Sequence, residues 1–595
     1  MRLVACVHCI KRSQLSKAIV IGTVGLALPV ATARTLAAGL TRHHATTYGN
    51  PVLAGDYSDP DVVRVGEDYY LVASSFSNTP GLPILHSRNL VDWTLIGHVL
   101  PRVTPNGHYS VPRRGGGVWA PAIVYRDGLF RIYYPDPDRG IFVVTAKDPR
   151  GPWTDPILVD ATRGAIDPAP FWDDDGSAWL AFAFAQSRAG VGNRIMLKRM
   201  NATGTTTVGD ARLIIDGSTQ PPVRTSIGPR PWQTTEGPKL YKRDGWYWLF
   251  APSGSVKGGW QGVFRARSLT GPWEGRNVMD QGRTTINGPH QGAWLHTAAG
   301  EDWFVHFSDA DSYGRQVHLQ PMHWRDGWPV IGRDDDGDGI GEPVETFRRP
   351  VVRGAIQTSS AAGTTPKALA SDEFDGPLSL EWQWQANPQD DWIGKGAPGW
   401  LRLTSASTPV DLWEAGNLLS AKLPGERFVT TAKLRFAPLR EGERTGLAMF
   451  GADYSWIGLV RDAHGVHVER VSRIVTDGER GTERGERGPA VANGADIWLR
   501  LAVEPIIVAD PIPGFSPYWP SMLRSKHARV RFSYSSDGRN FIPLGGTFVS
   551  KPGRWTGAQI GIFAQAPSGT PSFAATMTGY AEYDWVRSAL APVRR

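Results

Sequence analysis

Cysteine is nearly absent from this chain of 595 residues, which contains only Cys6 and Cys9. In a folded cytosolic domain their Cys-x-x-Cys spacing would suggest redox chemistry or half of a zinc site. Both lie in an N-terminal segment that we expect to be removed, so the mature chain would have no disulfides. Its stability must then come from burial of its 24 tryptophans and from β-sheet hydrogen bonds, which suffice for large β-domains.

Long apolar runs are equally scarce. The run from Ala18 to Val30 follows seventeen residues with four basic and no acidic side chains, and the small residues Ala31-Thr32-Ala33 come next. This pattern predicts a secretory signal peptide over residues 1–33 and therefore a secreted or periplasmic protein. A membrane anchor is the alternative, but the run is shorter than the about 20 residues of a spanning helix and contains Pro29. No later stretch is long enough, so we expect no membrane association after signal removal.

A strong excess of charge of one sign is also lacking. Removing residues 1–33 takes away four positive charges and no negative ones, which lowers the net charge from +7 to +3. The basic residues are scattered and accompanied by acids, so we expect no nucleic-acid partner.

Helical periodicity is almost missing from residues 48–350, where apolar residues alternate between Gly, Pro and Asp turns. Five segments read as β-hairpins, at intervals of 48 to 69 residues between turn glycines. That interval leaves room for about four short strands, which is the period of propeller blades. The sequence therefore predicts an all-β fold that begins with a five-bladed β-propeller. The turn glycines are Gly66, Gly128, Gly176, Gly245 and Gly300.

Polar or aromatic residues occupy equivalent positions seven to ten residues before these glycines: Asp59, Trp119, Asp167, Glu236 and His290. If each begins the inner strand of its blade, all five side chains converge on the propeller axis and form a site. Acids on different blades beside aromatic rings suit glycoside hydrolysis, in which one carboxyl group protonates the leaving oxygen and another activates water. Asp-Pro and Glu-Gly-Pro are also common turn formers, so each acid alone has a structural explanation.

The second half of the chain begins after a change in composition. Residues 351–371 are rich in Ser, Thr, Ala and Gly and are typical of a linker. From residue 372 to about 590 an alternating pattern returns, which predicts a β-sandwich.

Several motifs together resemble glycoside hydrolase family 43, the β-xylosidase and α-L-arabinofuranosidase family. They occur in the family's order in the propeller region, and the region from Asp372 resembles the concanavalin A-like sandwich that follows it in many family β-xylosidases. The motifs are Asn50-Pro51-Val52-Leu53-Ala54-Gly55-Asp56-Tyr57-Ser58-Asp59-Pro60-Asp61, Pro80-Gly81-Leu82-Pro83-Ile84, Trp119-Ala120-Pro121, Ile166-Asp167-Pro168, Glu236-Gly237-Pro238 and Gly288-Pro289-His290-Gln291-Gly292.

The resemblance implies a catalytic role for each of the three acids. Asp59 would be the general base and Glu236 the general acid, while Asp167 would orient Glu236 and help it to keep its proton. Family members usually have Pro before the base, whereas this chain has Ser58 there and Asp61 two residues after the base. This departure leaves Asp61 as a rival for the base.

The resemblance also places four residues in the sugar pocket. Phe76 and Trp119 would stack on sugar rings, with core packing as the alternative. Arg315 would bind sugar hydroxyls, although an ordinary ion pair would also explain it. His290 is a substrate contact or, equally, a buried axial histidine.

One acidic segment, residues 334–345, matches the EF-hand loop pattern without apparent flanking helices. The pattern predicts a site for a structural calcium ion, and a solvated acidic turn is the alternative. We expect that catalysis requires no cofactor. The predicted ligands are Asp334, Asp336, Asp338, Ile340 and Glu345.

The resulting expectation is an inverting exo-glycosidase that releases xylose, or arabinose, from xylan-derived oligosaccharides. An α-L-arabinofuranosidase or arabinan-active enzyme on the same scaffold is the first alternative. A non-catalytic carbohydrate-binding propeller is the second, and the retention of all three acids argues against it. The substrate would be a xylo-oligosaccharide or an arabinose-containing glycan, and the sequence does not indicate an oligomeric state.

Overall fold

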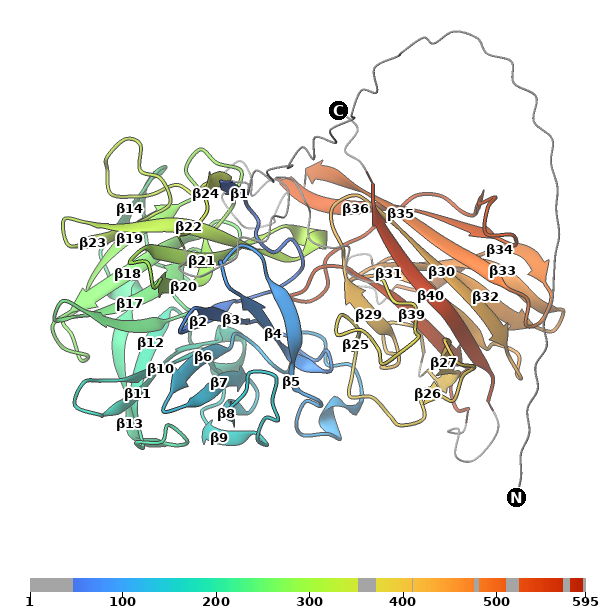
Figure 1. The fold of residues 1–595 in the computed structure, drawn as a ribbon, viewed down its shortest axis with the longest axis horizontal. Coiled ribbons are helices and arrows are strands. Elements are labelled where there is room, and N and C mark those ends of the chain that lie inside the picture. The colour runs from blue at the N-terminus through green and yellow to red at the C-terminus, as the bar shows by residue number, and fades with distance from the viewer. Residues whose placement is uncertain are drawn as a thin grey trace, which may run out of the picture. The chain divides into compact units, whose positions relative to one another are not determined.

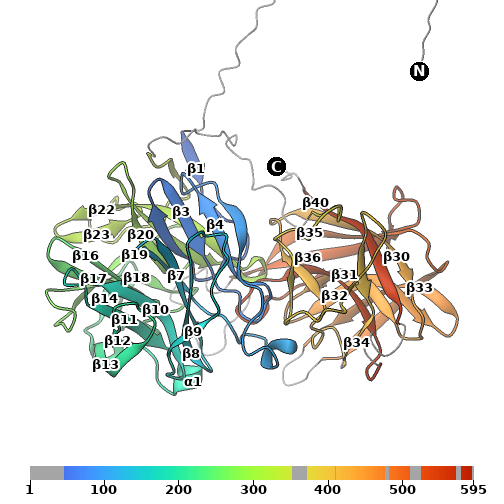
Figure 2. The ribbon, with the colours of Figure 1, turned by 60° about the horizontal axis from the view of Figure 1, so that its bottom comes forward.

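The computed structural model describes residues 46–351, 371–408, 410–475, 481–509, 524–570 and 578–591. The predicted signal peptide and all but the ends of the predicted linker lie outside these residues. Figures 1 and 2 show the propeller region from blue to yellow-green and the following region from yellow to red. No helix in the described part of the chain is both long and apolar enough for a membrane span.

Five four-stranded antiparallel sheets make up the propeller, as the sequence predicted. The first blade contains β2 (Asp61–Val65), β3 (Asp68–Val72), β4 (Gly81–Ser87) and β5 (Thr94–Leu100), and the second contains β6 (Ala122–Arg126), β7 (Leu129–Asp136), β8 (Gly140–Ala146) and β9 (Ile157–Asp160). The third contains β10 (Ala165–Trp172), β11 (Ala178–Phe184), β12 (Arg194–Met200) and β13 (Thr207–Asp216). The fourth contains β16 (Lys239–Arg243), β17 (Trp246–Ser253), β18 (Trp260–Ala266) and β19 (Glu274–Asp280), and the fifth contains β20 (His290–His296), β21 (Asp302–Asp309), β22 (Arg315–Arg325) and β23 (Trp328–Ile331).

Each predicted hairpin joins the first two strands of a blade. In the fourth blade the turn is made by Asp244 and Gly245, with φ of 51° and 69°. Two consecutive residues in the left-handed region are typical of the two-residue turn that matches the twist of paired strands, and glycine adopts this conformation without steric cost. Large apolar side chains pack between neighbouring blades, so the ring rather than the single blade forms the core.

Both ends of the propeller region meet in a small sheet. In this sheet β1 (Thr47–Gly49) pairs with β24 (Thr346–Arg348). The Asn50 side chain donates to the carbonyls of Leu319 and Val344 at 2.8 Å, so the start of the propeller region is bonded to the last blade and to the segment after it. Short elements fill the connections: β14 (Val223–Thr225), β15 (Gly228–Arg230), α1 (Gln186–Ala189) and the 3₁₀ turns η1 (His108–Ser110), η2 (Gly217–Thr219) and η3 (Asp311–Tyr313).

Two larger sheets form the predicted sandwich and enclose an apolar core. In spatial order, the first contains β25 (Gln383–Trp384), β29 (Leu419–Lys422), β39 (Gln559–Ala566), β31 (Arg444–Phe450), β32 (Tyr454–Asp462), β33 (Gly465–Arg473) and β34 (Glu483–Val491), with β28 (Ala406–Ser407) beside β39. The second contains β26 (Ile393–Gly394), β27 (Leu401–Thr404), β40 (Tyr580–Leu590), β30 (Phe428–Ala437), β35 (Ile497–Ala509), β36 (Arg524–Ser535) and β37 (Ile542–Pro543), with β38 (Phe548–Val549) beside β36.

The sandwich is bonded to the propeller through buried polar groups. Asn387 exchanges two hydrogen bonds of 2.8 Å with the backbone of Val103. The guanidinium of Arg114 lies over the rings of Trp413 and Phe450, at 4.8 and 4.6 Å from their centroids. The Asn387 contact is buried and the Arg114 contact is partly buried, and both join the propeller to the sandwich.

Candidate active site

A cavity of about 220 Å³ contains the three predicted acids, Asp59, Asp167 and Glu236. Asp59 and Glu236 lie just before the innermost strands of the first and fourth blades, and Asp167 lies within β10 of the third. The strands begin near the propeller axis, so residues more than a hundred positions apart meet there. Asp59 and Asp167 both have φ of 55°, a left-handed conformation that is uncommon for residues other than glycine and is concentrated at functional sites.

Two donors hold the carboxylate of Asp59. Arg315 Nη1 lies 3.0 Å from Oδ1, and Ser74 Oγ donates to Oδ2 at 2.6 Å. All three side chains are at least nine-tenths buried. A charge-assisted bond on one oxygen and a short hydroxyl bond on the other fix the orientation of this carboxylate.

Glu236 and Asp167 form an acidic pair. The backbone N–H of Gly237 donates to Asp167 Oδ2 at 2.8 Å, which places Asp167 next to Glu236. Burial raises the pKa of Glu236 well above its usual value, and the charges of Asp167 and Asp59 raise it further, while Arg315 opposes them. The pKa of Asp167 is also raised, chiefly by burial and then by Asp59. A carboxyl group with a raised pKa keeps its proton near neutral pH, as a general acid must.

His290 lies behind this pair rather than on the cavity surface. Its Nε2 is 3.5 Å from Glu236 Oε1, and the side chain is 1 % exposed. Burial and the charge of Arg315 lower the pKa of His290 to about 3, so the imidazole is neutral. His290 therefore contacts Glu236 and does not line the cavity, and its role stays a prediction.

The rival acid, Asp61, has a different environment. It accepts a hydrogen bond of 2.8 Å from the backbone N–H of Ile123 and faces Lys239 Nζ at 3.5 Å. Both charged groups are buried, and Asp61 does not line the cavity. The structure thus brings Asp59 to the cavity and gives Asp61 a place in a buried ion pair.

Phe76, Trp119 and Arg315 line the cavity, as the family resemblance implied. The rings of Phe76 and Trp119 meet edge to face with centroids 6.5 Å apart. Trp119 Nε1 donates to the carbonyl of Gly115 at 3.0 Å, which fixes the indole orientation. Aromatic faces and an arginine beside carboxylates are suited to a sugar ring.

Sequence reasoning missed Trp555, which lines the same cavity from the sandwich. Its ring lies 5.9 Å from that of Trp119, and the side chain of Arg315 is also 5.9 Å from it. Trp555 is 38 % exposed and has φ of 67°. Nothing in the local sequence signals this role, because Trp555 and the three acids are brought together only by packing of the sandwich on the propeller.

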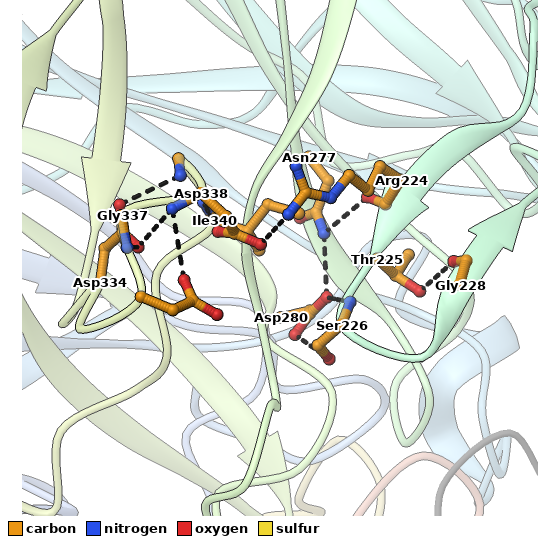
Figure 3. Close-up of polar contacts among 12 residues, drawn as sticks. Arg224, Thr225, Ser226, Gly228, Asn277, Asp280, Asp334, Gly337, Asp338 and Ile340 are labelled. Carbon is orange, nitrogen blue, oxygen red and sulfur yellow. Dashed lines mark hydrogen bonds and ion pairs between the residues drawn. The ribbon is translucent and has the colours of Figure 1, made fainter.

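The predicted calcium loop follows β23. Carboxylate oxygens of Asp334, Asp336 and Asp338 lie within 4.8 Å of one another. Two of these carboxylates already have cationic partners. Asp334 bonds Arg325. Figure 3 shows the other pair, in which Asp338 bonds Arg224 at 2.5 Å.

The other two predicted ligands have separate contacts. Glu345 accepts a hydrogen bond of 2.7 Å from Thr285, and the backbone N–H of Ile340 donates to Asp338 at 2.8 Å. The structure therefore brings three of the five predicted ligands together. Calcium binding stays a prediction.

A propeller with three carboxylates and aromatic side chains in one cavity is the arrangement of a glycosidase. The family model described as "Glycosyl hydrolases family 43" matches residues 48–329, and that of the "Beta xylosidase C-terminal Concanavalin A-like domain" matches residues 371–588. A relative from Xylanibacter ruminicola is 35 % identical over 517 residues, which cover 87 % of this chain and 86 % of the relative. The chain therefore belongs to glycoside hydrolase family 43.

Two further comparisons extend this likeness over most of the chain. A β-xylosidase of Formosa agariphila is 28 % identical over 591 residues, covering 91 % of this chain and 90 % of its own. The crystal structure of a xylan β-1,4-xylosidase from Bacillus halodurans matches with a TM-score of 0.74 and 24 % identity, covering 91 % of this chain and 99 % of that one. The structural match confirms the fold, with the propeller followed by the sandwich.

Proposed function

We propose that this glycoside hydrolase removes single xylose residues from the non-reducing ends of xylan-derived oligosaccharides. The observation that carries the proposal is the small cavity in which all three acids meet. Its volume of about 220 Å³ is below the about 300–1,000 Å³ of pockets for drug-sized ligands, so it suits one sugar residue better than a polymer segment. Several relatives are named β-xylosidases, which supports xylose as that residue.

The proposed mechanism uses the three acids in separate roles. Glu236, protonated because of its raised pKa, gives its proton to the glycosidic oxygen as the bond to the anomeric carbon breaks. Asp59, held by Ser74 and Arg315, takes a proton from a water molecule that attacks the opposite face of the sugar. The water oxygen becomes the new anomeric hydroxyl, and the configuration inverts. Asp167 keeps Glu236 protonated between turnovers.

An α-L-arabinofuranosidase is the second candidate. A relative from Bacteroides ovatus, 28 % identical over 466 residues that cover 72 % of this chain and 79 % of its own, is named a non-reducing end α-L-arabinofuranosidase. Both sugars are pentoses, and the same acids would serve either. We further propose, from the predicted signal peptide, that the enzyme acts outside the cytoplasm.

A panel of aryl glycosides tests the proposal. The wild-type chain is expected to hydrolyse 4-nitrophenyl β-D-xylopyranoside with a kcat/KM at least tenfold above that for the α-L-arabinofuranoside. A reversed preference would establish the second candidate. Absence of hydrolysis of every glycoside by folded protein would overturn the enzymatic role of the cavity.

Asp167→Asn is expected to move the alkaline limb of the pH profile to lower pH. Next to burial, the charge of Asp167 is the largest cause of the raised pKa of Glu236, so a neutral amide lets that pKa fall. Because the acid works only when protonated, activity is lost as pH rises through its pKa. A shift of about one pH unit or more is expected in kcat/KM, which reports the free enzyme. An unmoved alkaline limb would remove Asp167 from this role.

A further inference from the structure

Asp56 is a buried carboxylate beside the cavity that the proposed mechanism does not use. It lies three residues before Asp59 and is 8 % exposed. Its side chain does not line the cavity, and it bonds groups from both halves of the molecule. Its position therefore calls for a role other than contact with substrate.

Each oxygen of Asp56 accepts a backbone N–H at 2.9 Å. Oδ1 accepts from Arg315 in the propeller, and Oδ2 accepts from Gly557 in the sandwich. Arg315 is the residue whose guanidinium holds Asp59 Oδ1. Gly557 lies two residues after Trp555, which closes one side of the cavity. The Asp56 side chain thus bonds the backbone of Arg315, which holds the proposed base, and the backbone of Gly557, which is close to Trp555 in the sequence.

The packing around Asp56 leaves little room for adjustment. A Cβ added to Gly314 would lie 2.4 Å from the Cβ of Asp56, and one added to Gly557 would lie 2.6 Å from the nitrogen of Gly314. Both glycines therefore allow the three backbones to approach closely. A second bond, from Ala558 N–H to the Ser312 carbonyl at 2.8 Å, keeps the sandwich loop attached independently of Asp56.

Ser58 adds a third donor to the same carboxylate. Its Oγ lies 3.4 Å from Asp56 Oδ1. The family pattern usually has Pro at this position, and Pro has no hydroxyl to donate. Ser58, which stands where the family usually has Pro, therefore lies next to Asp56 in space as well as in sequence.

We propose that Asp56 is a positioning residue that aligns Arg315 and the Trp555 wall on the same sugar residue. Its carboxylate sets the backbone from which Arg315 reaches Asp59, and it sets the loop that carries Trp555 against the mouth of the cavity. One side chain thereby positions both the arginine that holds Asp59 and the sandwich loop that lines the cavity. This inference rests on the proposed glycosidase function.

The test is Asp56→Asn assayed on the aryl glycoside that the wild type hydrolyses best. The amide has the size of the carboxylate but has only one acceptor oxygen, so its NH₂ must face one of the two backbone N–H groups. A small displacement of catalytic groups costs up to about 10²-fold, so kcat/KM is expected to fall about 10- to 100-fold. The fall should be divided between a lower kcat, from Arg315, and a higher KM, from Trp555.

Trp555→Ala separates the two contributions. This variant is expected to raise KM by itself. Adding Asp56→Asn to it should then lower kcat without raising KM again. Such non-additivity in KM alone is expected only if Asp56 acts on KM through the Trp555 loop.

Asn387→Ala is the matched control, because Asn387 also bonds propeller and sandwich but lines no part of the cavity. It is expected to lower the denaturation midpoint as much as Asp56→Asn, with kcat and KM within about twofold of wild type. Unchanged kinetics in folded Asp56→Asn, or equal kinetic losses in both variants, would overturn the positioning role. Failure of the proposed function is distinguishable, because the wild type would then be inactive in the same assay.

Discussion

Glu236→Gln is expected to lower kcat on a xyloside with a poor leaving group by about 10²- to 10⁴-fold, the usual contribution of a general acid. Glutamine preserves the volume of the side chain but has no proton to give to the glycosidic oxygen. On 2,4-dinitrophenyl xyloside, whose leaving group scarcely needs protonation, the loss should be much smaller. Steady-state kinetics on a series of aryl xylosides measures this difference.

Glu274→Gln serves as the control for that experiment. Glu274 belongs to the same blade, on β19; its side chain is 53 % exposed and does not line the cavity. It is expected to leave kcat unchanged on every substrate. If Glu236→Gln lowered kcat by the same factor on substrates with good and with poor leaving groups, Glu236 would not be the acid.

Asp59→Asn is expected to lower kcat by about 10³- to 10⁴-fold on all leaving groups alike. The amide cannot take a proton from water, and it also removes the negative charge that faces Arg315. Because Asp59 acts on the water and not on the leaving oxygen, a better leaving group should not restore activity. This uniform loss distinguishes the base from the acid.

Proton NMR of the first-formed sugar checks the same assignment in the wild type. With Asp59 as base, a β-xyloside should release α-xylose first, before mutarotation. Asp61→Asn is the companion variant and is expected to reduce stability, because it leaves Lys239 buried without its anionic partner, while retaining most of kcat. Retained configuration, or a larger kcat loss in Asp61→Asn than in Asp59→Asn, would refute the base role of Asp59.

Glu236 and Asp59 show how much the chemistry of a carboxyl group depends on its environment. Glu236 and Asp59 are both carboxylates in one cavity, yet they have different partners. Glu236 is buried and has two other acids as neighbours, which favour its protonated form. Asp59 has a guanidinium and a hydroxyl, which donate to its oxygens. In the proposed mechanism, these different surroundings let the same functional group serve once as acid and once as base.

Much of the fold could be predicted because its signals are local. Turn pairs such as Asp244-Gly245 and alternating apolar residues depend on backbone conformation and on which face of a strand is buried, and both repeat from blade to blade. The repeat also placed Asp59, Asp167 and Glu236 at equivalent positions, which is why their meeting at the axis could be expected. Calcium binding in the acidic loop could not be decided in this way, because the pattern does not specify the partners of its carboxylates.

By itself, the sequence determined the five hairpins, the sandwich after them and the identity of the side chains that reach the propeller axis, since these follow from short-range periodicity. Only the tertiary structure decided that Trp555 closes the cavity and that Asp56 bonds both Arg315 and Gly557. It also placed Asp59 in the cavity and Asp61 in a buried ion pair, although the two acids are only two positions apart. The physical reason is the same in each case: contacts between residues far apart in the sequence depend on how preformed sheets pack, and no local pattern records that packing.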